Sequence, residues 1–109
     1  SAMVNPASVN CARQGGQLDI RTLPGGGEYG VCLFEDNRQC EEWALFRGEC
    51  PAGGIKITGY LDGTPEGEAR AHCAIRGGKL SGLQTGAATC ELPGKAACGA
   101  LDLYLGACP

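Results

Sequence analysis

The amino-acid sequence predicts an α+β fold in which two tandem, disulfide-stapled α-β-β-α units pack together and are joined by a linking strand. The first observation is the cysteine spacing. Successive cysteines lie 21, 8 and 10 residues apart in the set at 11, 32, 40 and 50, and 17, 8 and 10 apart in the set at 73, 90, 98 and 108. The second is that residues 11–18 align with residues 73–80, both segments starting with Cys-Ala and containing Gly-Gly. A tandem duplication of one four-cysteine unit accounts for both observations.

This repeat divides the chain into three parts. We expect residues 1–4 to be a disordered tag remnant that precedes a mature domain without its export signal. Residues 5–60 form the first four-cysteine unit with the linking strand, and residues 61–109 form the second, diverged unit. The chain of 109 residues has only 1 Trp, 3 Tyr and 2 Phe, so burial stabilises it weakly and covalent cross-links supply much of the rest.

Local signals place the elements of the first unit. Asn5 is a good N-cap, Pro6 suits the first helical position and Gly15 suits the end of a helix, which predicts a helix over residues 6–14. Alternating apolar residues predict a strand over 18–22. A turn at 24–27 and a returning strand over 29–34 complete a β-hairpin.

The remaining elements follow from capping and turn residues. Asp36 and Gln39 fit a capping box, and Gly48 fits the helix end, which predicts a second helix from residue 36 to 47. Residues 55–60 are expected to form the linking strand, and residues 61–67 a linker. Thr64 and Pro65 predict a helix start in the second unit, with Gly77 at its end.

An even number of cysteines in a short chain indicates disulfides and an oxidising compartment. Four cysteines allow three connectivities in each unit. In an α-β-β-α unit the end of the first helix lies near the start of the second, which favours Cys11–Cys40 with Cys32–Cys50. The same geometry favours Cys73–Cys98 and Cys90–Cys108 in the second unit.

Composition excludes several kinds of partner. The net charge is −3, from 9 basic and 12 acidic residues. This balance does not indicate the basic surface that binds nucleic acid or anionic lipid. No apolar run reaches the roughly 20 residues of a transmembrane helix. The chain has one histidine and no Cys-x-x-Cys pair, so we expect no metal site. The glycine runs lack the Lys-Ser/Thr of a phosphate loop, so we expect no cofactor.

We also expect no catalytic residues, and hence no enzyme activity. His72 adjoins Cys73, but adjacent helical side chains point about 100° apart, and a disulfide-bonded cysteine offers no thiolate. We interpret His72 as an exposed helix residue. Acidic residues gather around the predicted start of the second helix, where the helix dipole stabilises them; these are Glu35, Asp36, Glu41 and Glu42.

The first unit resembles a known family. The resemblance covers residues 5–50 and rests on Asn-Pro at 5–6, Gly-Gly at 15–16, Tyr-Gly-Val-Cys at 29–32, Gln-Cys-Glu-Glu-Trp-Ala at 39–44 and Phe-Arg-Gly-Glu-Cys at 46–50. These motifs are similar to those of a small bacterial cysteine-containing family of unknown function, often labelled as a hemolysin, here as a tandem two-unit member. The resemblance implies a periplasmic, outer-membrane lipid-anchored or secreted protein.

Two functional hypotheses follow. The first is a non-enzymatic module that binds a protein partner in the envelope or outside the cell, most concretely as an inhibitor of a hydrolase or peptidase. Its predicted contacts are Leu23, Pro24, Glu28, Tyr29, Trp43 and Phe46. The second is a membrane-active, hemolysin-like toxin, or a purely structural envelope protein. The second unit has Leu101 at the position that matches Trp43, so we expect it to be mainly structural, with Ile55, Ile57 and Tyr60 at the junction.

Overall fold

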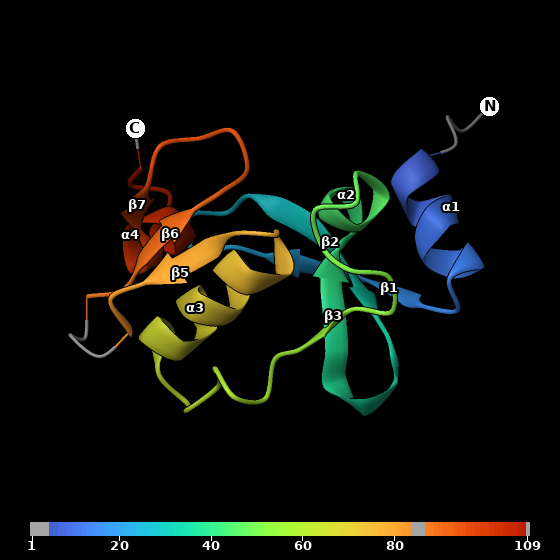
Figure 1. Ribbon diagram of the computed structural model, residues 1–109, viewed down its shortest axis with the longest axis horizontal. Helices are drawn as coiled ribbons and strands as arrows, with labels where there is room; N and C mark the ends of the chain where they lie inside the picture. Colours follow the sequence, from blue (N-terminus) through green and yellow to red (C-terminus); the bar gives the residue numbers. More distant parts are fainter. Residues whose placement is uncertain (1–4, 84–86, 109) are drawn as a thin grey trace.

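The computed structural model describes residues 5–83 and 87–108 (Figure 1). The expectation of a disordered tag remnant at residues 1–4 falls outside these residues. The elements of the first half, residues 5–60, are α1 (Pro6–Arg13), β1 (Gln17–Thr22), β2 (Glu28–Leu33), the 3-10 turn η1 (Glu35–Asn37), β3 (Arg38–Glu41), α2 (Glu42–Phe46) and β4 (Ile55–Lys56). Those of the second half, residues 61–108, are α3 (Pro65–Ile75), β5 (Lys79–Ser81), β6 (Thr89–Glu91), β7 (Cys98–Gly99) and α4 (Ala100–Leu105).

Within the described residues the strands form two small antiparallel sheets. The first has the order β1-β2-β3-β4 and the second the order β5-β6-β7. With the four disulfides, this arrangement confirms the predicted α+β class. The origin of the two halves by duplication, and their division after residue 60, stay predictions. None of the helices in the described residues has the length and apolar character needed to cross a membrane.

The first helix and the hairpin form as the local signals predict. The Asn5 side chain accepts hydrogen bonds from the backbone N–H groups of Ala7, at 2.9 Å, and Ser8, at 3.3 Å, so two of the unpaired donors at the start of α1 are satisfied. Gly15 follows the helix with a φ of 84°, a conformation that costs glycine little. β1 and β2 then pair from Gln17 opposite Leu33 to Thr22 opposite Glu28.

The prediction of a second helix over residues 36–47 is wrong. Asp36 and Asn37 adopt φ values of 64° and 61°, which short polar side chains tolerate better than most. They therefore close a tight turn, and Gln39 continues as β3 beside β2. α2 is left with only residues 42–46. The linking strand is also shorter than predicted, because only Ile55 and Lys56 pair with β3.

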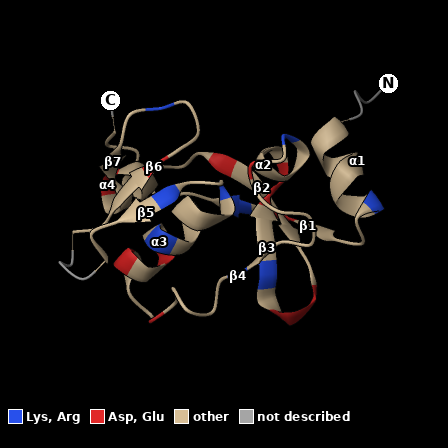
Figure 2. Ribbon diagram, viewed as in Figure 1, with Lys and Arg blue, Asp and Glu red and all other residues tan. Residues whose placement is uncertain are grey.

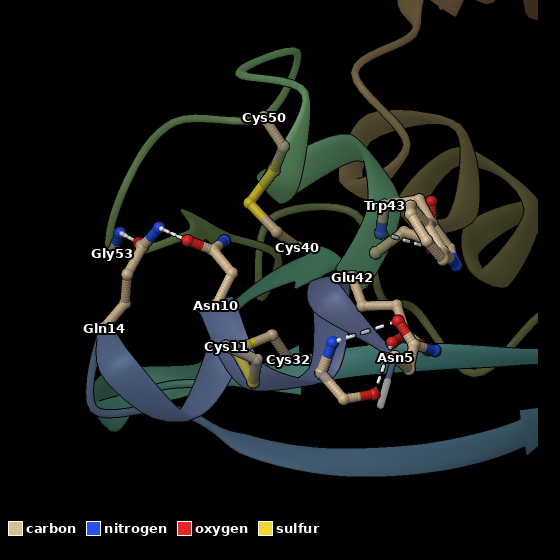
Figure 3. The surroundings of a disulfide bond; sticks show 12 residues. Asn5, Asn10, Cys11, Gln14, Cys32, Cys40, Glu42, Trp43, Cys50 and Gly53 are labelled. Carbon is tan, nitrogen blue, oxygen red and sulfur yellow. Dashed lines mark hydrogen bonds between the residues drawn. A yellow bond between two sulfur atoms is a disulfide. The ribbon is translucent and has the colours of Figure 1, made fainter. Parts of the chain in front are cut away.

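All eight cysteines form disulfides, but each expected pairing is wrong. The bonds join Cys11 to Cys32, Cys40 to Cys50, Cys73 to Cys90 and Cys98 to Cys108. The reason lies in the sheets: Cys32 stands opposite Cys40 on β2 and β3, and Cys90 stands opposite Cys98 on β6 and β7. In each half one strand cysteine bonds to the preceding helix and the other to the segment after the following helix. Figure 3 shows the two bonds of the first half.

The repeated Gly-Gly pairs serve these bonds. A Cβ at Gly16 would collide with the Sγ of Cys32, and a Cβ at Gly78 would lie 2.7 Å from the Sγ of Cys90. Van der Waals contact needs about 3.5 Å or more. The second glycine of each pair is therefore required by close packing on sulfur.

The two faces of the first sheet are covered by different parts of the chain. Successive residues of a strand point to opposite faces. Cys32 points toward α1 and α2 and packs with Cys11 and Ala44. Val31 points to the other face and packs with Ala71 and Ile75 of α3. α3 thus lies between the two sheets, as Figure 1 shows for the yellow helix in the middle of the molecule.

This second face forms the junction core, which consists of Val31, Ile57, Ala71 and Ile75, with Tyr29, Leu33, Ile55 and Tyr60 at its margin. Ile55, Ile57 and Tyr60 lie at the contact between the halves, as predicted. The opposite side of α3 packs in the second half, where Ala69 and Cys73 contact Cys90, Leu92 and Ala100.

We expect Ile75→Ala to lower the free energy of unfolding by about 2–4 kcal/mol, because it removes a buried aliphatic side chain and leaves a cavity. Unfolding should remain one cooperative transition, since the junction core takes residues from both halves. Urea denaturation followed by circular dichroism measures both quantities. Leu83→Ala, at a side chain 52% exposed, is the matched control and should change stability by less than about 0.5 kcal/mol. Two separate transitions in the unmodified protein would contradict this account.

Candidate functional site

A groove opens where the β1–β2 hairpin, α2 and α3 meet. Its volume is about 520 Å³. We call it the Trp43 groove, and it is lined by Ile20, Leu23, Glu28, Tyr29, Gly30, Glu41, Glu42, Trp43, Arg47, His72 and Arg76. Both halves contribute to it, because His72 and Arg76 come from α3.

The structure brings together four of the six predicted contact residues. Leu23, Glu28, Tyr29 and Trp43 all line the Trp43 groove. Phe46 is exposed beside the groove and packs against the Trp43 ring, with the ring centres 5.8 Å apart and the planes at 87°. This edge-to-face arrangement is a favourable geometry for two aromatic rings.

The sixth predicted contact, Pro24, lies at the hairpin tip and does not line the groove. The tip is a closed turn, in which the Leu23 N–H donates to the Gly27 carbonyl at 2.7 Å and the Gly26 N–H donates to the Leu23 carbonyl at 2.8 Å. The tip lies beside the end of α4, since a Cβ at Gly25 would be 3.5 Å from the Leu105 carbonyl oxygen. The hairpin therefore runs along the second half instead of projecting from the molecule (Figure 1).

The two acidic residues before Trp43 hold α2 in place. Glu41 is buried, and its carboxylate accepts hydrogen bonds from the N–H groups of Trp43, at 2.8 Å, and Ala44, at 3.1 Å. Glu42 is also buried and accepts a hydrogen bond from the Ser8 hydroxyl at 2.8 Å (Figure 3). Sequence reasoning placed these acids around a helix that starts at residue 36, but the helix starts at Glu42. It also missed that both acids are buried and that Glu41 caps the helix directly.

Gly30 makes room for the second of these acids. A Cβ at this position would collide with the Glu42 carboxylate. The glycine of the Tyr-Gly-Val-Cys motif thus lets the carboxylate lie flat on β2, where it reaches α1 through Ser8.

The interpretation of His72 as an exposed residue is wrong. Its side chain is 2% exposed, and neither ring nitrogen has a hydrogen-bond partner among the described residues. The ring lies between Tyr29, with centres 5.1 Å apart, and Tyr104, at 5.6 Å. Burial, helped by the positive charge of Arg76, lowers the pKa of His72 from 6.5 to about 4. The ring is therefore neutral at pH 7.

The spacing of His72 from its neighbours on the helix is a sequence signal that indicates its burial. His72 stands three residues from both Ala69 and Ile75, which are buried on α3. Residues three apart share a helical surface. α3 is packed on two sides because it contacts both sheets, so most of its surface is buried.

Burial also affects Tyr29. It raises the pKa of Tyr29 above the usual 10, although nearby Arg21 acts in the opposite direction. The Tyr29 hydroxyl is therefore protonated at neutral pH. In residues 5–83 and 87–108, no three His, Cys, Asp or Glu side chains come together in a way that could hold a metal ion.

Comparison with known proteins finds relatives of the first half. Residues 2–49 match the model of a family described as a domain of unknown function (DUF333). The uncharacterized protein YoaF of Escherichia coli K12 is 41% identical over 51 residues, which are 47% of this chain and 60% of YoaF. YoaF of Shigella flexneri matches to the same extent. The chain thus spans 60% of the length of these curated relatives. No solved structure matches it.

These similarities support the expected resemblance to small bacterial proteins of unknown function. The hemolysin label and the two-unit arrangement stay predictions. The segment similar to the family carries Tyr29 and Trp43, whereas His72 and Arg76 lie beyond it. The groove of this chain is therefore built from the family-like segment and from α3 together.

The buried His72 should make the protein less stable in mild acid. Unfolded, the ring binds a proton below pH 6.5, but the folded protein binds it only below about pH 4. The unfolded state therefore takes up more protons between these values, and stability falls as the pH drops from 6.5 to 4. A shift of this size corresponds to about 3 kcal/mol.

Urea denaturation at several pH values between 8 and 4 measures this loss. His72→Leu removes the titrating group, so the gap in unfolding free energy between the unmodified protein and the variant should change by about 3 kcal/mol across this range. A gap that stays constant with pH would show that His72 does not titrate with a lowered pKa.

Proposed function

We propose that this protein is a non-enzymatic protein-binding module that works in an oxidising compartment, in the periplasm, on the outer membrane or outside the cell. Four disulfides support the compartment, because such bonds persist where the surroundings are oxidising. The resemblance to an exported family points the same way. The proposed contact surface is the Trp43 groove.

The observation that carries the proposal is the convergence of Leu23, Tyr29 and Trp43 on one open groove. Trp and Tyr are the residues that most often dominate binding energy at protein interfaces. Trp43 is exposed although it sits on a helix that is tied at both ends, by the Glu41 cap before it and by the Cys40–Cys50 disulfide that spans it. A surface that is already ordered loses less entropy on binding.

The charges of the groove favour an uncharged occupant. Glu41 and Glu42 are buried and hydrogen-bonded, and Arg47 pairs with Glu49 at 2.8 Å. Glu28 and Arg76 also line the groove and carry opposite charges. The occupant that fits is an extended segment of a partner protein that places an apolar or aromatic side chain against Trp43, flanked by polar residues.

Inhibition of a hydrolase or peptidase remains the most concrete form of this function. The hairpin tip lies against α4, so we propose that an inhibited enzyme is contacted through the groove and not through an inserted loop. The absence of enzyme activity is part of the same proposal. Its support is that every cysteine is disulfide-bonded and that both buried carboxylates of the groove are engaged in structural hydrogen bonds.

Replacing Trp43 by Ala should weaken partner binding by roughly thirtyfold or more, the effect of losing about 2 kcal/mol at a central interface residue. Affinity capture from bacterial envelope extract, followed by calorimetry with the purified partner, measures this effect. Leu83→Ala changes an exposed residue outside the groove and should bind normally. A partner held equally by the Trp43→Ala protein would show that the groove is not the contact surface.

The same samples test the alternatives. Dye release from liposomes at micromolar protein would favour the membrane-active toxin. Protein that neither captures a partner nor releases dye would favour a structural role in the envelope.

A further inference from the structure

The outer edge of β1 is an open strand edge. In the described residues β1 pairs with β2 alone, at the end of the four-stranded sheet. The Leu23 N–H donates to the carbonyl of Gly27, which stands opposite in the continued register. Because hydrogen bonding alternates along an antiparallel strand, the N–H and C=O groups of Asp19 and Arg21 point to β2.

The same alternation directs the N–H and C=O groups of Leu18, Ile20 and Thr22 outward. The far side of β2 agrees with this assignment. There the Phe34 N–H donates to the Arg38 carbonyl, so even-numbered residues of β2 face β3 and odd-numbered residues face β1. β1 therefore presents three residues whose backbone donors and acceptors lie on its free edge.

The side chains of this strand are accessible on both faces. Leu18 and Ile20 share one face and are 38% and 55% exposed. Asp19 and Arg21 share the other, where Arg21 pairs with Asp19 at 2.9 Å and with the Gln39 side chain at 2.9 Å. The strand contains neither the proline nor the lysine with which many proteins protect such an edge.

The order of the charges makes the edge complementary to itself. In an antiparallel pair of identical strands centred on Ile20, Asp19 of each copy stands opposite Arg21 of the other. Opposite charges in directly facing positions stabilise a strand pair. The outward groups of Leu18, Ile20 and Thr22 would form six backbone hydrogen bonds across the same axis, two for each facing pair.

We propose that β1 pairs with β1 of a second copy of this chain, about a twofold axis at Ile20, and so joins the two first sheets of a dimer into one continuous sheet. A twofold contact uses the same patch on both partners, which this strand satisfies. Replacing the Arg21–Asp19 ion pair within each chain by the same pair between chains costs little, because each arginine keeps an aspartate partner. The proposal of this dimer is independent of the proposed binding partner. Ile20 also borders the Trp43 groove, so the grooves of the two copies would lie near the twofold axis.

Charge-reversal variants test the pairing by sedimentation equilibrium. Asp19→Arg and Arg21→Asp each place like charges opposite one another, so each should weaken the dimer by roughly tenfold or more. The double variant D19R/R21D restores opposite charges at both facing positions and should recover the dimer. Monomeric behaviour of the unmodified protein at high concentration, or a double variant no better than the single ones, would overturn the proposal.

A second variant keeps the test independent of the ion pairs, because Arg21 also supports the fold through Gln39. Ile20→Pro removes an N–H that points outward, and edge strands tolerate proline at such positions. It should keep the circular dichroism spectrum of the folded protein and abolish the dimer. A folded Ile20→Pro protein that still dimerises would contradict pairing through β1.

Hydrogen exchange identifies the edge directly. Raising the protein concentration should slow exchange at the amides of Leu18, Ile20 and Thr22, while those of Asp19 and Arg21 are protected at every concentration by β2. Protection that does not alternate in this way would show that association uses another surface. Trp43→Ala should dimerise normally, which separates failure of the dimer from failure of the groove.

Discussion

Cys32 and Cys40 face each other on neighbouring strands. The fold of the first half depends on the two disulfides that these cysteines form with Cys11 and Cys50. One bond holds α1 over the sheet and the other holds the segment that follows α2. The buried core above this face therefore consists of four cysteines with Ala44 and Leu45. Because the cross-links fix the helices, α2 can be only five residues long and still keep Trp43 at the surface. An isolated helix of that length would not be stable in water.

The opposite face of the same sheet has no disulfide and relies on α3. Val31 and Ile57 pack there against Ala71 and Ile75, so the two halves share one apolar core. His72 lies on the same helix, and its burial without a hydrogen-bond partner in the described part of the chain opposes folding. Both tyrosine rings beside it come from elements outside α3. The helix is thus held by contacts on two sides, and these contacts also hold His72 and Arg76, the residues with which α3 lines the groove.

Local sequence signals predicted α1, α3 and the β1–β2 hairpin, because Asn5-Pro6, Thr64-Pro65 and the glycines that follow each helix act within a few residues. The signal at Asp36 and Gln39 was misread, since Asp36 and Asn37 adopt positive φ and extend the sheet. The disulfide pairing followed from that error: with a helix at 36–47, Cys40 could not be placed beside Cys32. For the groove, Trp43 and Tyr29 were identified by residue type alone. The helical spacing of His72 indicates its burial, but that His72 and Arg76 line the groove follows only from the packing of the two halves.

The packing also revises the role of the second half. It has Leu101 where the first half has Trp43, and the sequence therefore suggested a mainly structural unit. α3, however, supplies His72 and Arg76 to the groove while its other side packs in the second half. The segment similar to the family ends at residue 49, before Ile57 and α3. In this chain, then, the second half covers the sheet face that the first half leaves apolar, and the same helix that covers it closes one side of the groove.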